Sequence, residues 1–262
     1  MTAVLFAVSA SPASAQVGAT RAQHQHARAG TSRFHVPVLE YHRFIPSDLA
    51  SPRVLRFDVP PSLFDAQLTA LQAAGWHTIT AAQLAQDLAS GTRPDPKTFI
   101  ITIDDGHEDG YTAALPILRA HGMVATYYVI AGRIDERHPT DPSLSSEQVL
   151  ALVQAGMEIG NHTYSHVRLA ALTAAEQEQE IASASARLAA ITGQVPTTMA
   201  YPFGSFDGVT ERAAHAAGIQ LAFDSSFGAH ESASGRLRSP RLHVGVEDTP
   251  AMLLARLSAF AH

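Results

Sequence analysis

Residues 98–106 read TFIITIDDG, a run of apolar and β-branched residues that ends in two aspartates and a glycine. The uncharged run Thr98–Ile103 is typical of a strand that is buried on both faces of a parallel sheet. Asp104 and Asp105 follow directly at the carboxyl end of that strand. The stretch therefore predicts an α/β fold with two carboxylates at the edge of its sheet.

Strand and helix signals alternate on both sides of this stretch. Ser145 with Gln148 and Thr173 with Glu176 form capping boxes that predict helix starts, and the sequence has neither a P-loop nor a Rossmann glycine pattern. About seven β units predict one irregular (β/α)7 barrel, a single catalytic domain, with an open doubly wound sheet as the alternative. The other expected strands are Val36–Tyr41, Val124–Ile130, Met157–Gly160, Thr197–Tyr201, Ile219–Phe223 and Leu242–Val244, with a short one at Thr78–Ile79.

The N-terminal residues differ in character from the rest of the chain. Val4–Val8 is a short apolar core and Ala13-Ser14-Ala15 resembles a cleavage site. We therefore expect residues 1–15 to be a signal peptide, residues 16–33 a disordered linker and residues 34–262 the catalytic domain. No charged residue precedes the apolar core, which leaves a disordered Ala-rich terminus as the alternative. No apolar run approaches the roughly 20 residues that span a bilayer. The prediction is a secreted, periplasmic or envelope-associated protein.

Composition narrows the classes of partner. The chain has 262 residues, of which 46% are hydrophobic and 16% charged, and this favours a sizeable core over disorder. Its formal net charge is −6, and none of its 24 acidic residues precedes Glu40. Because nucleic acids and anionic membranes select basic surfaces, neither is an expected partner. The sequence has no cysteine, which excludes disulfides and thiolate chemistry. The oligomeric state stays open.

Polar residues stand directly after several predicted strands. In β/α barrels the chemistry lies at the carboxyl ends of the strands, so we expect these residues to converge on one face. His162 and His166 are four residues apart and can face one metal ion, although chance alone yields about 0.7 such pairs.

The two aspartates add weight to the histidine pair. Adjacent carboxylates at the end of a buried strand repel each other unless a cation holds them. Neighbouring strand residues point in opposite directions, so one aspartate can bind a metal while the other acts as a base. A simple turn before Gly106 is the alternative interpretation of Asp104 and Asp105.

Three motifs resemble those of a known family. Thr102-Ile103-Asp104-Asp105-Gly106 resembles the first motif of the polysaccharide deacetylases, carbohydrate esterase family 4. His162-Thr163-Tyr164-Ser165-His166 resembles the second motif, and Tyr201-Pro202-Phe203-Gly204 resembles the third. The motifs stand in the expected order, and the resemblance covers residues 36–244. It implies a hydrolase that removes acetyl groups from glycans.

The resemblance also implies a role for each motif residue. Asp105, His162 and His166 would bind a divalent metal. Zinc suits one carboxylate and two imidazoles, while cobalt, nickel, manganese and iron accept the same donors. Asp104 would be the general base. Tyr201, Pro202 and Phe203 would contact the substrate, with the backbone N–H of Phe203 stabilising the oxyanion.

The sequence departs from the family pattern in two places. Ala200 stands where the third motif usually carries an arginine that steadies the catalytic aspartate, and Arg238 or Arg241 is the candidate replacement. The usual late general-acid histidine is also unclear, because Leu242-His243 echoes its motif only loosely.

The start of the domain offers another general acid. Leu39-Glu40-Tyr41-His42 resembles a segment of a circularly permuted branch that includes deacetylases of poly-β-1,6-N-acetylglucosamine. In that branch the strand with the acid precedes the first motif, so the resemblance predicts His42 as the general acid. A histidine that only packs at the end of a strand is the alternative.

Together these expectations describe an exported, metal-dependent deacetylase, a hydrolase of carbon–nitrogen bonds other than peptide bonds. Its substrate would be an N-acetylated amino-sugar polymer of the poly-N-acetylglucosamine type. The alternatives are deacetylation of chitin oligomers, peptidoglycan, xylan or a small amide, and a non-catalytic glycan-binding relative. Outside the motifs, we interpret Trp76 as core packing and His107, Glu108 and Asp109 as a solvated loop beside the cleft.

Overall fold

The computed structural model describes residues 35–46, 57–227, 229–230 and 235–260, which lie within one compact unit. The expected signal peptide and linker lie outside the described residues. The strands are β1 (Val36–Tyr41), β2 (His77–Thr78), β3 (Thr98–Ile103), β4 (Thr126–Val129), β5 (Glu158–Asn161), β6 (Thr198–Ala200), β7 (Leu221–Phe227), β8 (Ala229–His230) and β9 (Ser239–His243). The α-helices are α1 (Pro61–Ala73), α2 (Ala81–Ser90), α3 (Leu115–Ala120), α4 (Ser146–Gln154), α5 (Ala174–Thr192), α6 (Gly208–Ala216) and α7 (Pro250–Ser258). Short helical turns are η1 (Gly110–Ala114), η2 (Ala131–Arg133), η3 (Leu169–Ala171) and η4 (Pro202–Gly204).

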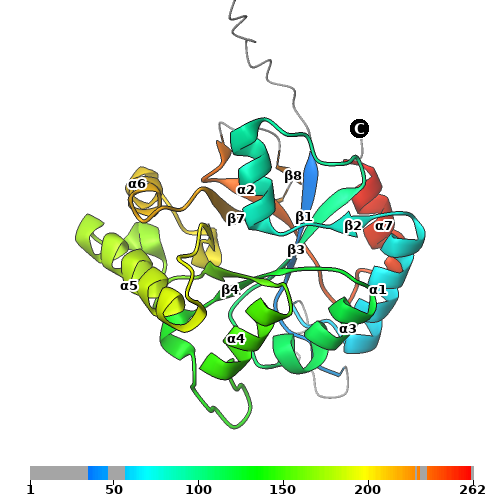
Figure 1. Ribbon diagram of the computed structural model, residues 1–262, viewed down its shortest axis with the longest axis horizontal. Coiled ribbons are helices and arrows are strands. Elements are labelled where there is room, and N and C mark those ends of the chain that lie inside the picture. The colour runs from blue at the N-terminus through cyan, green and yellow to red at the C-terminus, as the bar shows by residue number, and fades with distance from the viewer. Residues whose placement is uncertain (1–34, 47–56, 228, 231–234, 261–262) are drawn as a thin grey trace, which may run out of the picture. The chain divides into compact units, whose positions relative to one another are not determined.

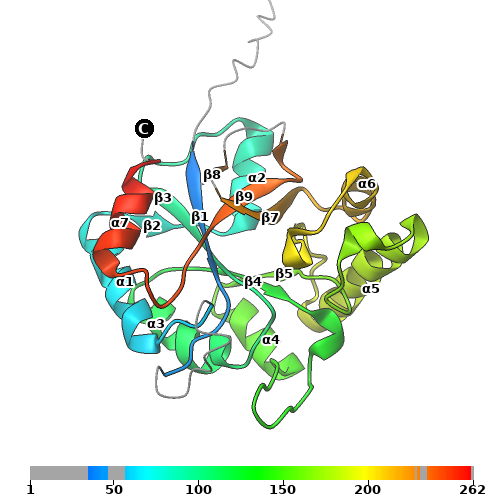
Figure 2. The same cartoon turned by 180° about the vertical axis from the view of Figure 1, so that it is seen from behind.

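Seven parallel strands close into a barrel. Neighbours follow the order β3, β4, β5, β6, β7, β9 and β1, and β1 also pairs with β3. Leu39 of β1 is in register with Ile101 on one side and with Leu242 on the other. Because β1 has a parallel partner on each side, the ring is closed, which confirms the barrel and excludes the open doubly wound sheet. Figures 1 and 2 show the helices arranged around these strands.

Two strands lie outside the ring. β2 pairs in parallel with β3, and β8 pairs antiparallel with β1. Every residue of β1 and β3 is buried, and for β3 the uncharged run predicts this. Trp76, which precedes β2, is buried and packs edge-on against Phe99 with 6.2 Å between ring centroids. This contact confirms its interpretation as a core residue.

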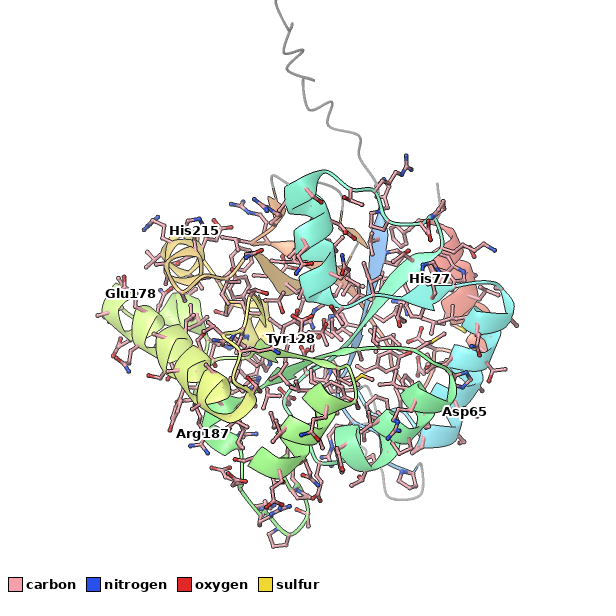
Figure 3. All side chains as sticks on the ribbon, in the orientation of Figure 1. Asp65, His77, Tyr128, Glu178, Arg187 and His215 are labelled. Atoms are coloured by element: carbon pink, nitrogen blue, oxygen red, sulfur yellow. The ribbon has the colours of Figure 1, made fainter. Side chains whose placement is uncertain are left out.

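The local signals of the helices are confirmed. α4 and α5 begin with the predicted capping boxes, and α5 ends at Gly193 in the left-handed conformation. The described part of the chain contains no helix that is both long and apolar enough to cross a bilayer. In Figure 3, Glu178 and His215 lie at the periphery on α5 and α6, whereas Tyr128 of β4 lies in the middle.

Several strand boundaries differ from the prediction. β5 extends to Asn161, β7 starts at Leu221 rather than Ile219, and β9 starts at Ser239 rather than Leu242. Pairing explains the two extensions, because Asn161 pairs with Met199 of β6, and Ser239 and Arg241 find partners in β7 across an irregular register. A strand's length therefore depends on its neighbours as well as on its own residues.

The barrel brings the predicted site residues to one end. His42 follows β1, Asp104 and Asp105 follow β3, His162 follows β5, and Tyr201 follows β6. Because these strands are parallel, their carboxyl ends open onto the same face.

Candidate active site

Asp105, His162 and His166 converge on one point. Asp105 Oδ1 lies 3.3 Å from His162 Nε2 and 3.2 Å from His166 Nε2. Asp105 and His166 have positive φ angles of 73° and 58°, which turn the chain sharply at both residues. The structure therefore assembles the three residues that the resemblance assigns to metal binding.

The turn that carries the two histidines is held by polar contacts. Asn161 Oδ1 accepts a hydrogen bond from Thr163 N at 2.7 Å, and Thr163 Oγ1 accepts one from His166 N at 3.0 Å. Asn161 is anchored in turn, because its Nδ2 donates to the carbonyl of Ile181 in α5. These contacts fix the spacing between the two imidazoles.

The three side chains fit a divalent metal. Asp105 Oδ1 is buried, and within the described segments no hydrogen bond of acceptable geometry reaches it. His162 Nδ1 lies 2.8 Å from the carbonyl oxygen of Ala200, which requires the proton on Nδ1 and leaves the Nε2 lone pair for a ligand. Together with His166 Nε2, which also faces Asp105 Oδ1, these atoms supply one carboxylate oxygen and two imidazole nitrogens that could share one cation.

Asp104 lies beside this cluster and is paired with Arg241. Arg241 Nη1 and Nη2 donate to the two carboxyl oxygens of Asp104 at 2.8 and 2.7 Å, a bidentate pair. Burial alone would raise the pKa of Asp104, but the charge and hydrogen bonds of Arg241 outweigh it and lower that pKa. Asp104 is therefore held ionised, as a general base requires.

Arg241 provides the cation that the third motif lacks. It is fully buried, although it lies 137 residues along the chain from Asp104. The other candidate, Arg238, is exposed and pairs with Glu211 instead. Of the two arginines, only Arg241 contacts Asp104.

Glu40 shares the same guanidinium. Its Oε2 lies 3.1 Å from Arg241 Nε, and its Oε1 lies 3.3 Å from His243 Nδ1. Burial, partly offset by Arg241, raises the pKa of Glu40 to about 7. Glu40, His42 and Asp104 each place one donor atom within 4.8 Å of the others. Because Arg241 already neutralises this group, we do not regard it as a second metal site.

Two further histidines, His42 and His243, lie beside Glu40. His42 Nε2 lies 3.7 Å from Glu40 Oε1, and its ring lies 5.0 Å from that of Phe57. Burial lowers the pKa of His42, against the opposing charges of Asp104 and Asp105. His243 Nε2 lies 3.1 Å from the carbonyl oxygen of Ser225, so that nitrogen carries a proton.

These side chains line a cavity of about 290 Å³. Phe203 is 54% exposed at its rim, and its ring lies 4.7 Å from that of His166. Tyr201 also lines the cavity, but its hydroxyl donates to the carbonyl of Leu237 and its ring stacks on Phe206. Pro202 is buried. Of the third motif, Phe203 is therefore the residue with an exposed side chain at the cavity.

The interpretation of His107 as part of a solvated loop is wrong. Its side chain is 11% exposed and lies between two carboxylates, 3.5 Å from Asp105 Oδ2 and 2.7 Å from Asp141 Oδ1. These carboxylates outweigh burial and raise the pKa of His107 to about 9. In the sequence, only its position two residues after Asp105 indicates that His107 belongs to the site, because its other partner, Asp141, lies in a distant loop.

Comparison with known proteins agrees with this geometry. The family model described as polysaccharide deacetylase matches residues 91–222. The chain belongs to the polysaccharide deacetylase family.

A relative and a solved structure extend the match over most of the chain. The Bacillus subtilis (strain 168) protein named "Putative polysaccharide deacetylase YxkH" is 31% identical over 209 residues, which cover 80% of this chain and 71% of that protein. The structure of Streptococcus pyogenes deacetylase PplD in complex with acetate is 26% identical, with a TM-score of 0.79 over 86% of this chain and 99% of that one. A chitin deacetylase from Pestalotiopsis sp is 32% identical over 113 residues, 42% of this chain and 35% of that protein.

This polysaccharide deacetylase is therefore a hydrolase that acts on an acetylated glycan. Members of carbohydrate esterase family 4 depend on a metal, and the Asp105, His162 and His166 cluster is the candidate site for it.

Proposed function

We propose that this polysaccharide deacetylase removes N-acetyl groups from an amino-sugar polymer of the poly-N-acetylglucosamine type. Water would attack the acetamide carbonyl, the C–N bond would break, and acetate and a free amine would leave. The observation that carries the proposal is the Arg241-paired carboxylate of Asp104 beside the Asp105, His162 and His166 cluster in one cavity. A glycan-binding relative without catalysis would have no need for a buried, ionised carboxylate there.

Asp105, His162 and His166 would hold the metal, for which zinc is our choice among the divalent ions that accept these donors. When bound, the metal would acidify the attacking water and polarise the acetamide carbonyl.

Asp104 would act as the general base. Its carboxylate would take a proton from water as the new C–O bond forms. Arg241 would hold both oxygens of Asp104 in place, and its charge would keep the carboxylate ionised before each turnover.

Residues of two other loops would stabilise the negative charge on the carbonyl oxygen and protonate the leaving nitrogen. The backbone N–H of Phe203, in a left-handed turn with φ of 59°, would donate to the carbonyl oxygen as negative charge develops on it. His42 would give its proton to the sugar nitrogen as the C–N bond breaks. Burial lowers the pKa of His42, which favours release of that proton.

The choice of an N-acetylated glucosamine polymer rests on two supports. The chitin deacetylase match spans part of the barrel and concerns an enzyme named for a polymer of N-acetylglucosamine. The position of His42 ahead of Asp104 resembles the permuted branch that includes deacetylases of the β-1,6-linked polymer. We also propose that the protein works outside the cytoplasm, as residues 1–15 suggest, where such polymers occur.

Acetate release tests the proposal. Metal-stripped protein, with and without added Zn²⁺ or Co²⁺, is incubated with β-1,6- and β-1,4-linked N-acetylglucosamine oligomers of equal length, beside Asp104→Ala. We expect metal-dependent release that the substitution abolishes, with preference for the β-1,6 linkage. Preference for the β-1,4 linkage would indicate a chitin-like polymer as the substrate instead. Absence of release from either, despite metal binding, would contradict deacetylation of these glycans.

A further inference from the structure

The two oxygens of Asp105 have different neighbours. Oδ1 faces His162 Nε2 and His166 Nε2 at 3.3 and 3.2 Å. Oδ2 faces the other way, toward His107 Nε2 at 3.5 Å. A carboxylate that offers one oxygen to a cation must be prevented from rotating, and a partner on its second oxygen does this.

His107 is itself held on its other side. Its Nδ1 lies 2.7 Å from Asp141 Oδ1, which leaves the ring clamped between two carboxylates. A neutral imidazole has one N–H and one acceptor nitrogen, and two carboxylates offer acceptors only. Each carboxylate therefore favours an N–H on the ring nitrogen that faces it, and Nε2 is the nitrogen placed to donate to Asp105.

Arg43 extends the chain of contacts to a third loop. Its Nη1 lies 3.1 Å from Asp141 Oδ1, and its Nε lies 3.1 Å from Asp109 Oδ2. The backbone N–H of Phe44 also donates to Asp109 at 3.2 Å. The series Asp105, His107, Asp141 and Arg43 thus connects the end of β3 with loops that follow β1 and precede α4.

Backbone pairing fixes this arrangement. Leu144 N donates to the carbonyl of Gly106 at 2.9 Å, and Glu108 N donates to that of Pro142 at 2.9 Å. Gly106 has φ of 74°, and a Cβ there would lie 2.9 Å from Cγ1 of Val129. Only glycine fits this turn without strain, so the direction in which His107 leaves the first motif is set by the backbone.

We propose that His107, held by Asp141, is a positioning residue that orients Asp105 as a ligand for the metal. This inference rests on the proposed function of the Asp105, His162 and His166 cluster. His107 itself does not join that cluster, because the described donor atoms that gather within 4.8 Å of one another there come from those three residues. Its effect passes through Oδ2 of Asp105.

The shape of the imidazole suggests a matched pair of variants. The amide nitrogen of glutamine can occupy the place of His107 Nε2, which faces Asp105, whereas that of asparagine reaches only the place of Nδ1, which faces Asp141. His107→Gln therefore keeps a donor for Asp105, and His107→Asn and His107→Phe do not. His138→Gln is the control, because His138 is exposed in the loop that also carries Asp141.

The experiment measures Zn²⁺ affinity of metal-stripped protein by competition with a chromophoric chelator, and the visible spectrum of the Co²⁺-loaded protein. We expect His107→Asn and His107→Phe to weaken Zn²⁺ binding about 10- to 100-fold and to alter the Co²⁺ bands. His107→Gln should recover most of the affinity, Asp141→Asn should lose less than His107→Phe, and His138→Gln should match wild type. Thermal unfolding of the metal-free variants checks that each one folds.

Three outcomes would overturn the inference. Affinities of His107→Asn and His107→Gln that are equal would show that the donor to Asp105 is irrelevant. A loss in His107→Phe as large as in His166→Ala would make His107 a ligand rather than a positioning residue. A wild-type protein that binds no divalent metal would remove both this inference and the proposed function. Metal binding with the expected variant order but without acetate release would contradict the proposed function alone.

Discussion

The two ends of the barrel hold carboxylates in opposite ways. At the amino end, Glu158 of β5 accepts hydrogen bonds from Thr126 Oγ1 and from Ala82 N at the start of α2, both at 2.8 Å. At the carboxyl end, Asp104 is held by the charged fork of Arg241. Burial raises the pKa of Glu158 against these neutral donors, whereas Arg241 lowers that of Asp104 against burial.

The difference shows what makes a carboxylate useful for catalysis. Neutral donors provide hydrogen bonds to the Glu158 carboxylate but do not offset the free-energy cost of burying its charge. Its role is therefore structural, because it connects α2 to the barrel. A full positive charge at Asp104 keeps the anionic form available in a dry site. Substitutions at the two ends should therefore have opposite consequences.

The largest effect is expected at Asp104, the proposed general base. Asp104→Asn keeps the shape of the side chain but removes its ability to take a proton, so kcat for acetate release should fall about 10²- to 10⁴-fold. Zn²⁺ affinity should stay near that of wild type, because Asp105 rather than Asp104 is the proposed ligand. Turnover within a few fold of wild type would show that another group is the base.

Removal of the cation should be the next most damaging change. Arg241→Met leaves Asp104 and Glu40 buried without a counter-charge, so the free energy of unfolding should fall by about 3–5 kcal/mol. Activity at a temperature where the variant is folded should also fall, because more of Asp104 is protonated at neutral pH. Arg238→Met is the matched control, since Arg238 pairs with Glu211 on the surface. Equal stability of the two variants would contradict the role of Arg241.

The two histidines at the rim give a smaller, more selective effect. We expect His42→Gln to lower kcat about 10²-fold, the lower end of the range for a general acid, and His243→Gln to lower it less. The effect of His42→Gln should shrink on an ester substrate, because its alcohol leaves more easily than an amine. A larger loss in His243→Gln would assign the acid to β9 instead of β1.

The smallest effect is expected at the amino end. Glu158→Gln should change activity by no more than about twofold. Because the folded state raises the pKa of Glu158, the wild-type unfolding free energy loses this group's contribution as pH rises from the unfolded-state value of about 4.3. Glutamine does not titrate, so the variant should gain stability relative to wild type between pH 4 and pH 7. Chemical denaturation at the two pH values measures this, and a relative loss would contradict the sign.

The sequence by itself determined much of this protein. The uncharged strand of Thr98–Ile103 with its two terminal aspartates, the His162 and His166 pair, and the capping boxes of α4 and α5 are local patterns, and each appears in the structure where it was predicted. Such features depend on hydrogen bonds and side-chain directions within a few residues, so residues adjacent in sequence are enough to predict them.

Only the tertiary structure decided which distant residues complete the site. Arg241 could not be separated from Arg238 by sequence, and the contact of His107 with Asp141 had no local signal. Both depend on barrel closure and strand register, since β9 must reach β1 and β7 before Arg241 meets Asp104. A buried charge is tolerated only where the fold places an opposite charge beside it, and the separation of two residues along the chain does not show whether they meet.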